Sequence, residues 1–279
     1  MKKTYQDLIK ALKKEVKNTG LEKVVIGLSG GLDSAVTLKL AVDALGADNV
    51  TALIMPEIGL SSQENIDHAK ILAEHLEVKS FYQPINSFLV SFNFIPWGQN
   101  HTSQLNLRSR IRMILLYHFA NKNSALVLGT SNKSELMLGY GTKYGDLAAD
   151  IEVIGNLYKT DVFELARYMG MPDELINKTP TAELAPGQTD EDELGATYDK
   201  LDIILKLYEE GRDEEDMISR GLDPTLTRKT VRRIKNNEHK LKIPPVLTAE
   251  IKKANEINPP EIATEAPNVL EGQQQLFGG

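Results

Sequence analysis

Gly27-Leu28-Ser29-Gly30-Gly31-Leu32-Asp33-Ser34 is the stretch of sequence that decides the predicted fold. Residues 23–28 (KVVIGL) are rich in β-branched side chains, as buried strands are, and an apolar helical pattern follows over residues 34–45. Two adjacent glycines between a strand and a helix let the backbone turn tightly and direct its N–H groups toward an anion. The segment therefore predicts an anion-binding turn at a helix N-terminus.

Further strands and helices alternate on the C-terminal side of this turn. The expected strands are residues 50–55, 78–82 and 125–128, and the expected helices are residues 61–75 and 105–121. Ser61 is predicted to cap the first of these helices, with Glu64 at capping-box spacing. Alternation at this spacing predicts an α/β fold, in which a parallel sheet is flanked by helices on both faces.

The character of the chain changes after residue 150, where helical patterns dominate. They cover residues 159–169, 191–209, 213–219 and 226–237. We predict a helical C-terminal part within a single domain over residues 1–258. Residues 259–279 are rich in Pro, Gln, Glu and Gly and are expected to form a flexible tail.

Composition excludes several kinds of site. The 279 residues carry a formal charge of -7 and include no cysteine, which excludes disulfides, thiolate metal sites and cysteine nucleophiles. The acidic balance argues against a nucleic-acid groove. No apolar run approaches the roughly 20 residues that span a bilayer, and the N-terminus predicts an amphipathic helix instead of a signal peptide. We therefore expect a cytoplasmic protein without a membrane partner.

Asp33 is the unexpected member of the glycine turn, because a carboxylate repels a phosphate. The conflict disappears if Asp33 holds a Mg²⁺ that also binds the phosphate. Glu135 lies one turn into the helix that follows the strand at 125–128, where it would share that metal. The alternatives are a helix-capping role for Asp33 and a solvated or capping role for Glu135. The turn is neither a Walker sequence nor a dinucleotide fingerprint.

Three further segments suggest ligand contacts. Arg108, Arg110 and Arg112 lie within one and a half helical turns, so they either face solvent or bind phosphate or carboxylate. Lys159 opposes the dipole at a helix N-terminus, a mismatch typical of anion sites. The polar loop 179–190 is long enough to be either a lid or disordered, and we expect a lid that closes over the site.

SGGLDSA resembles the pyrophosphate-binding signature of the N-type ATP pyrophosphatases, which implies the adenine nucleotide α-hydrolase-like fold. Other motifs narrow the resemblance to the NAD synthetase family, of the ammonia-dependent type. They are the RxRM helix, GTSNKSE, TKYGD, LYK, PTAxL and EHK, in the family's order over residues 20–245. The resemblance implies a ligase that uses ATP to amidate deamido-NAD through an acyl adenylate, giving NAD, AMP and pyrophosphate.

The resemblance also implies roles for individual residues and no side-chain nucleophile. The implied ATP-binding residues are Gly27, Leu28, Ser29, Gly30, Gly31, Leu32, Asp33, Ser34, Thr130, Lys159 and Thr181. The implied contacts of deamido-NAD are Arg110, Lys143, Asp150, His239 and Lys240. Asp33 and Glu135 are the implied ligands of the Mg²⁺ cofactor, and Asp33, Lys143 and Lys159 are expected to position the substrates.

Because the chain lacks a cysteine and the length of a glutaminase domain, free ammonia or a separate glutaminase subunit must supply the nitrogen. The family further implies a homodimer. Two other readings are a different ATP pyrophosphatase, either similar to GMP synthetase or tRNA-modifying, and a catalytically silent nucleotide-binding regulator.

Overall fold

Five parallel strands form the central sheet of the computed structural model, which describes residues 1–249 except 182, 186 and 188. They are β1 (Lys23–Gly27), β2 (Val50–Ile54), β3 (Lys79–Tyr82), β4 (Ala125–Gly129) and β5 (Ile151–Glu152). Their order across the sheet is β3-β2-β1-β4-β5. The chain builds outward from β1 to β3 and then returns to the other side of β1, so a crevice is expected beyond the carboxyl ends of β1 and β4.

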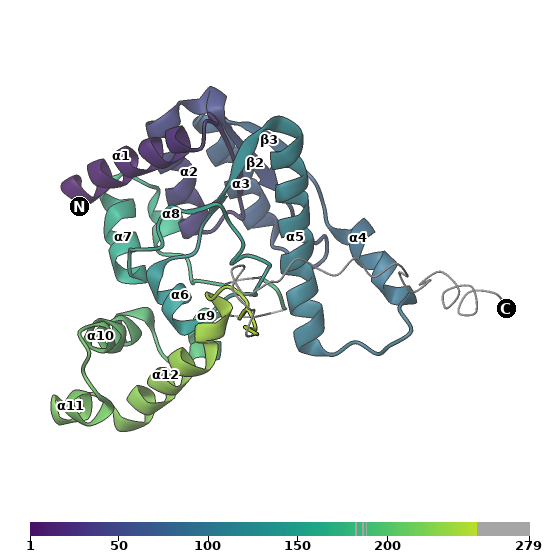
Figure 1. The fold of residues 1–279 in the computed structure, drawn as a ribbon. Helices are drawn as coiled ribbons and strands as arrows, with labels where there is room; N and C mark the ends of the chain where they lie inside the picture. Colours follow the sequence, from purple (N-terminus) through teal and green to yellow (C-terminus); the bar gives the residue numbers. More distant parts are fainter. Residues whose placement is uncertain (182, 186, 188, 250–279) are drawn as a thin grey trace, which may run out of the picture. The chain divides into compact units, whose positions relative to one another are not determined.

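Helices cover both faces of this sheet (Figure 1). One face packs against α1 (Lys2–Asn18), α2 (Leu32–Leu45), α3 (Gln63–His75), α7 (Lys159–Tyr168) and α8 (Asp173–Ile176), and the other against α5 (His101–Asn123). Side chains alternate along β1, so Val24 and Ile26 enter the first core and Val25 enters the second. α4 (Asn86–Ser91) precedes α5.

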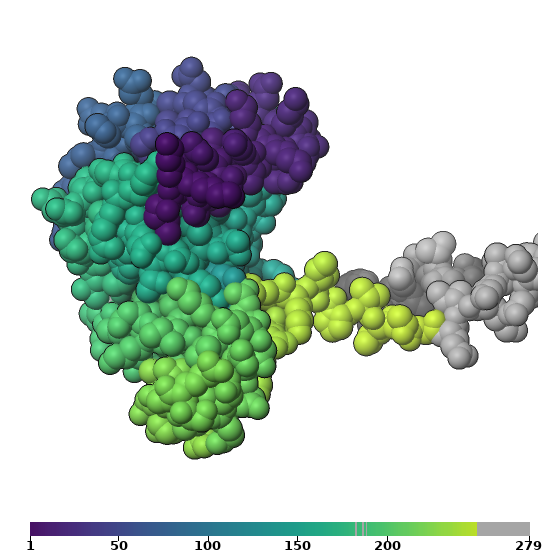
Figure 2. Space-filling model, turned by 90° about the vertical axis from the view of Figure 1, so that its left-hand side faces the viewer, coloured from purple at the N-terminus to yellow at the C-terminus, as the bar shows by residue number. Residues whose placement is uncertain are grey.

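The remaining helices pack together beside the sheet, and those after residue 190 form the green lower part of the view in Figure 2. They are α6 (Lys133–Leu138), α9 (Asp190–Leu194), α10 (Tyr198–Glu209), α11 (Glu214–Ser219) and α12 (Pro224–Asn237). Short 3-10 helices cover Ala47–Asn49, Phe92–Phe94 and Glu238–Lys240. Leu138, Leu205 and Ile234 are buried where α6, α10 and α12 meet. Residues 1–242 form one compact unit, which includes this helical part.

The parallel sheet, the flanking helices and the helical C-terminal part are confirmed, and each expected strand is present within one residue of its predicted ends. The single predicted helix over residues 191–209 is wrong: Gly195 adopts a left-handed φ of 86° and ends α9, and α10 begins at Tyr198. Ser61 is not the cap of α3, because the Ser62 side chain accepts the Asn65 amide. The predicted boundary at 258/259 and the predicted tail lie outside the described residues.

No helix within the described part of the chain is both long and apolar enough to cross a membrane.

Candidate functional site

The turn after β1 is held in shape by its own two serines. The Ser29 and Ser34 hydroxyl oxygens lie 3.0 Å apart, the Gly31 amide donates to the Ser29 hydroxyl at 3.2 Å, and the Ser34 hydroxyl donates to the Gly31 carbonyl at 3.0 Å. Gly30 has a φ of 82°, and a Cβ there would lie 2.0 Å from the Asn65 carbonyl oxygen. Gly31 caps α2 without a side chain, which leaves the first amides of the helix available to an anion.

A cavity of about 460 Å³ opens beside this turn, at the carboxyl ends of β1, β2 and β4. Ten of the eleven predicted ATP-binding residues line it, and both predicted metal ligands do so as well. The exception is Gly30, which packs beneath the backbone of α3. The structure therefore brings together residues that are up to 154 positions apart, from Gly27 to Thr181.

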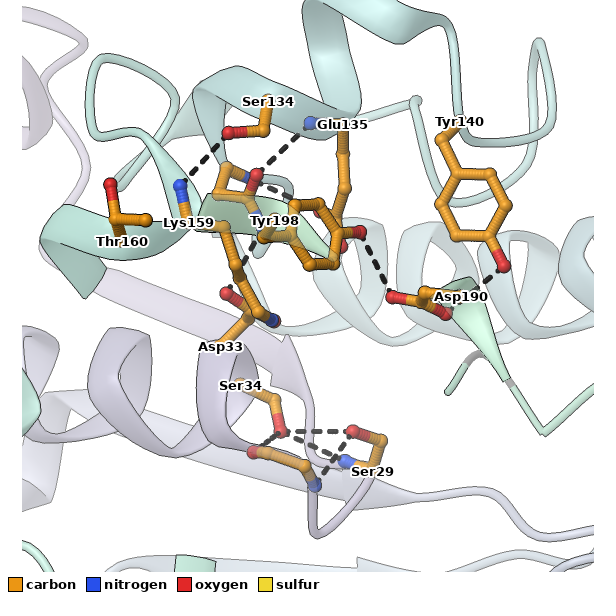
Figure 3. A network of polar contacts seen from close by, with 12 residues as sticks. Ser29, Asp33, Ser34, Ser134, Glu135, Tyr140, Lys159, Thr160, Asp190 and Tyr198 are labelled. Carbon is orange, nitrogen blue, oxygen red and sulfur yellow. Dashed lines mark hydrogen bonds and ion pairs between the residues drawn. The ribbon is translucent and has the colours of Figure 1, made fainter. Parts of the chain in front are cut away.

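Lys159 projects from the N-terminus of α7 toward the turn (Figure 3). Its ammonium group contacts the Asp33 carboxylate, and its side chain is only 3% exposed. The start of α7 is fixed by two neighbouring helices: the Lys159 amide donates to the Ser134 hydroxyl at 2.9 Å, and the Thr160 amide donates to Asp202 at 2.9 Å. The helix end thus aims Lys159 at the phosphate turn despite the unfavourable dipole.

Three carboxylates surround the Lys159 ammonium. Asp33 also accepts the Asn132 side-chain amide at 3.2 Å, while Glu135 accepts the Asn132 backbone amide at 3.0 Å. The third is Asp190, which accepts the hydroxyls of Tyr140 and Tyr198. Burial first, and then the charge of Asp33, raises the pKa of Glu135 well above its ordinary value. Burial also raises the pKa of Asp190. Burial alone would lower the pKa of Lys159, but the negative charge of Asp33 and Glu135 raises it.

These groups fit a divalent cation that a phosphate ligand also helps to hold. Three carboxylates and one ammonium leave a formal charge of -2 when all are ionised, and one divalent cation offsets that charge. Within residues 1–249, outside the three gaps, no three His, Cys, Asp or Glu side chains gather closely enough to hold a metal ion. Mg²⁺ is commonly bound through one or two carboxylates together with substrate phosphates, which is the donor set available here.

Basic residues from three distant segments meet near the cavity. The Arg110 guanidinium donates to the Lys143 carbonyl at 3.2 Å, and the Lys143 ammonium donates to the His239 carbonyl at 2.7 Å. Lys240 lines the cavity and donates to the Gly139 carbonyl. Of the predicted deamido-NAD contacts, Lys240 alone lines the cavity, and Asp150 is placed apart from the other four. Its carboxylate accepts the Val127 amide at 2.7 Å and the Tyr117 hydroxyl at 3.3 Å.

The three arginines of α5 have different surroundings. Arg108 forms an ion pair with Glu57, and Arg112 donates to the Met55 carbonyl at 2.9 Å. Burial lowers the pKa of Arg112, which lines the cavity. Arg110 is exposed. Two of the three guanidinium groups are therefore bound to the segment that directly follows β2.

Part of the predicted lid lines the cavity, together with the residue before it: these residues are Lys178, Thr179, Pro180, Thr181, Glu183, Leu184 and Asp190. Lys178 donates to Glu64 at 2.9 Å, and the Glu183 carboxylate accepts the Ser62 amide at 3.3 Å. At the other end, the Asp190 amide donates to the Pro180 carbonyl at 3.0 Å. The predicted lid thus contacts the N-terminal turn of α3, although its residues 182, 186 and 188 are outside the described part.

Sequence reasoning missed two buried acids of this region. Asp190 is the first residue of an Asp-Glu-x-x-Leu-Gly-x-x-Tyr pattern over residues 190–198 that belongs to the resemblance, but the pattern assigns no role to this acid. Glu152 lies against Gly129, whose missing side chain makes room for it. Within the described residues, neither Glu152 carboxylate oxygen has a hydrogen-bond partner, and burial raises the pKa of this group to about 7. The neighbouring Ser131 backbone opposes that shift without reaching hydrogen-bond geometry.

Comparison with known proteins agrees with the family resemblance of the sequence motifs over most of the chain. The sequence model of the NAD synthase family matches residues 4–244. An NH(3)-dependent NAD(+) synthetase of Methanocaldococcus jannaschii is 46% identical, covering 88% of this chain and 96% of the relative. The corresponding enzyme of Methanosarcina acetivorans is 43% identical, covering 88% and 97%.

Solved structures of similar fold include NAD synthetases as well. An NH3-dependent NAD synthetase from Campylobacter jejuni, in complex with the nitrate ion, aligns with a TM-score of 0.76 at 36% identity, covering 88% of this chain and 98% of that one. An NMN synthetase from Francisella tularensis aligns with a TM-score of 0.73 at 34% identity, covering 90% and 98%. A glutamine-dependent NAD+ synthetase from Acinetobacter baumannii aligns with a TM-score of 0.61 at 35% identity, covering 88% of this chain but only 47% of that one.

Proposed function

The chain belongs to the NAD synthase family, and we propose that its cleft is where ATP and ammonia convert deamido-NAD to NAD, with release of AMP and pyrophosphate. One observation carries this proposal: the glycine turn, Lys159 and the half-buried acids Asp33 and Glu135 converge on one cavity at the carboxyl ends of the strands. A site with backbone amides, a buried ammonium and metal-binding carboxylates suits a triphosphate and offers no nucleophile of its own.

The triphosphate of ATP would lie along the turn from Gly27 to Ser34. The first amides of α2 and the serine hydroxyls would donate to its oxygens, and Lys159 would offset its negative charge. We assign the cofactor as Mg²⁺, held by Asp33 and Glu135 together with phosphate oxygens, and its chemistry would be to mask phosphate charge. Thr130 and Thr181 line the cavity and would contact the rest of the nucleotide.

The reaction needs positioned groups and no covalent enzyme intermediate. A carboxylate oxygen of deamido-NAD attacks the α-phosphorus of ATP, and the bond to the β-phosphate breaks to release pyrophosphate. Ammonia then attacks the acyl carbon, and AMP leaves with that oxygen. Asp33, Lys143 and Lys159 would contribute by holding the two substrates in line, since alignment alone removes much of such a barrier. Closure of the 179–190 loop would protect the acyl adenylate from water.

The deamido-NAD site would use the basic group formed by Arg110, Lys143, His239 and Lys240. These residues come from α5, the 141–150 loop and the 3-10 helix Glu238–Lys240 after α12, and their contacts join them near the cavity. Cationic side chains suit the pyrophosphate of a dinucleotide. Asp150 would contribute from the junction of α5 and β4, where its carboxylate is already held by two donors.

We further propose a homodimer. The segment between β3 and α5 exposes several large apolar side chains, with Phe94 83% and Trp97 67% exposed. Phe88 and Phe92 of the same segment are exposed as well. A run of this kind on the surface favours a protein interface.

Ammonia itself, or a separate glutaminase, would be the nitrogen source, because the chain has no cysteine for an internal glutaminase.

The test is to incubate the protein with ATP, Mg²⁺ and deamido-NAD, with either ammonium or glutamine as the nitrogen donor. NAD should form with ammonium and not with glutamine alone. A parallel reaction with nicotinate mononucleotide measures the alternative that the NMN synthetase similarity raises. The absence of NAD under all conditions would refute the proposed function. Faster amidation of nicotinate mononucleotide than of deamido-NAD would instead identify the mononucleotide as the preferred substrate.

A further inference from the structure

Asp190 is a buried acid on the edge of the cleft that the proposed reaction does not yet use. It is the first residue of α9, lines the cavity and is only 3% exposed. The Tyr140 and Tyr198 hydroxyls each donate to one of its carboxylate oxygens at 3.0 Å. Figure 3 shows both rings directed at this carboxylate from opposite sides. A carboxylate held by two donors has a fixed position, which a site residue needs.

Lys159 is the cation whose charge acts on this carboxylate. The Lys159 ammonium lies 5.6 Å from the centre of the Tyr198 ring, so the ring that holds Asp190 also contacts the lysine. The Phe163 ring lies at 5.7 Å. The negative groups that act on the lysine are Asp33, Glu135 and Asp190. The ammonium therefore contacts the Asp33 carboxylate and two aromatic rings, and the charges of Glu135 and Asp190 also act on it.

Two of these three carboxylates are the metal ligands of the proposed function. A carboxylate that shares its charge with a divalent cation attracts a neighbouring ammonium less strongly. Lys159 would then lose much of the attraction that now directs it to Asp33, while remaining almost completely buried. Asp190 is the carboxylate of the three that the metal does not engage, so it would keep its attraction for the lysine.

We propose that Asp190, held by Tyr140 and Tyr198, is a positioning residue that keeps the Lys159 ammonium at the phosphate turn once nucleotide and metal occupy Asp33 and Glu135. This inference rests on the proposed use of ATP in the cleft. The Asp190 amide also donates to the Pro180 carbonyl, which joins the two ends of the cavity-lining loop. One residue thereby links the position of that loop to the position of the lysine.

Asp190→Asn tests the proposal, because it keeps the size of the side chain and removes its charge. The matched control is Asp199→Asn, an exposed acid adjacent to Tyr198. Both proteins would be compared with the unchanged chain for NAD formation and for the rise in unfolding temperature that ATP with Mg²⁺ produces. We expect Asp190→Asn to raise the KM for ATP about tenfold and to shrink the ATP-induced rise, with the KM for deamido-NAD changing less than about twofold. Asp199→Asn should change none of these values.

Two further variants separate positioning from a structural role. Asp190→Glu restores the charge and should recover part of the ATP affinity. The double variant Tyr140→Phe, Tyr198→Phe keeps the charge but frees the carboxylate, and should raise the KM for ATP about threefold. If Asp190→Asn does not fold, the tyrosine double variant and Asp190→Glu decide the question.

The proposal is overturned if Asp190→Asn binds ATP as the unchanged chain does. Equal losses of ATP and deamido-NAD affinity, together with a lower unfolding temperature, would also overturn it, since they indicate general disruption. Absence of NAD formation by the unchanged chain would count against the proposed function and not against this inference, because ATP-induced stabilisation is measured without turnover.

Discussion

Gly30 and Gly31 are adjacent in the phosphate turn, yet substitution by alanine should affect them very differently. At Gly30, φ is 82°, and a Cβ would lie 2.0 Å from the Asn65 carbonyl oxygen and 2.9 Å from the Asn65 Cα. The obstacle is the backbone of α3, whose first turn is fixed by the Ser62 cap. At Gly31, φ is -89°, and a Cβ would lie 3.3 Å from the Ser29 hydroxyl, which can rotate away.

The magnitudes follow from these contacts. A left-handed conformation costs a non-glycine residue about 1–2 kcal/mol, and moving α3 away from the new methyl group adds to this, for a total of about 3 kcal/mol. For a chain of this size that loss lowers the unfolding temperature by about 6–12 °C. Gly31→Ala should cost about 1 kcal/mol or less, since its conformation is open to alanine and only the cap preference is lost.

The assay is thermal unfolding with and without ATP and Mg²⁺. Gly30→Ala should unfold at the lower temperature and lose most of the stabilisation by nucleotide, because the turn must leave its anion-binding shape. Gly31→Ala, the comparison variant, should nearly keep its unfolding temperature, and it should lose less of the stabilisation by nucleotide than Gly30→Ala, although it lies in the same turn. The reasoning is refuted if Gly30→Ala unfolds with the unchanged chain, or if the two variants are equally damaged.

Three other outcomes are expected. Asp33→Asn should reduce the rate of NAD formation at least about 100-fold in a steady-state assay, because both Lys159 and the metal lose their anionic partner. A smaller reduction in rate would argue against the proposed role of Asp33. Burial raises the pKa of Glu152 from its ordinary value of 4.5 to about 7, so the folded state binds this proton more tightly than the unfolded state. The free energy of unfolding that this proton contributes is complete below pH 4.5 and is lost as the pH rises through 7. In chemical denaturation from pH 5 to 8, Glu152→Gln should gain about 1–3 kcal/mol in free energy of unfolding over the unchanged chain at the upper end. Parallel plots of unfolding free energy against pH for the two proteins would contradict this. Phe94→Glu combined with Trp97→Glu should convert the proposed dimer to a monomer in sedimentation velocity, with an unchanged sedimentation coefficient as the contrary result.

The sequence predicts those parts of the fold whose signals are local. The β-branched run before Gly27 and the glycines after it mark a strand, a turn and a helix start by their own conformational preferences. β5 was missed because two residues, Ile151 and Glu152, are too few to show a period. The break at Gly195 was missed because apolar residues continue at helical spacing on both sides of it.

The site shows the same division between local and long-range information. Asp33, Glu135 and Lys159 could be proposed because each stands at a strand end or helix start of recognisable type. The role proposed for Asp190 depends instead on two tyrosine hydroxyls, one from the segment after α6 and one from α10, that meet only in the folded chain. Glu152 is similar, because its burial results from the pairing of β5 with β4. The Asp-Glu-x-x-Leu-Gly-x-x-Tyr pattern over residues 190–198 includes Asp190 and Tyr198 but does not show that they meet, and nothing local marks Glu152.

The central claim is that the turn binds ATP so that its α-phosphorus is the atom attacked. The most direct measurement uses deamido-NAD labelled with ¹⁸O in its carboxylate, followed by mass spectrometry of the products. The account predicts one ¹⁸O in each AMP, none in pyrophosphate, and AMP equal in amount to NAD. Label in inorganic phosphate, with ADP as the nucleotide product, would contradict it.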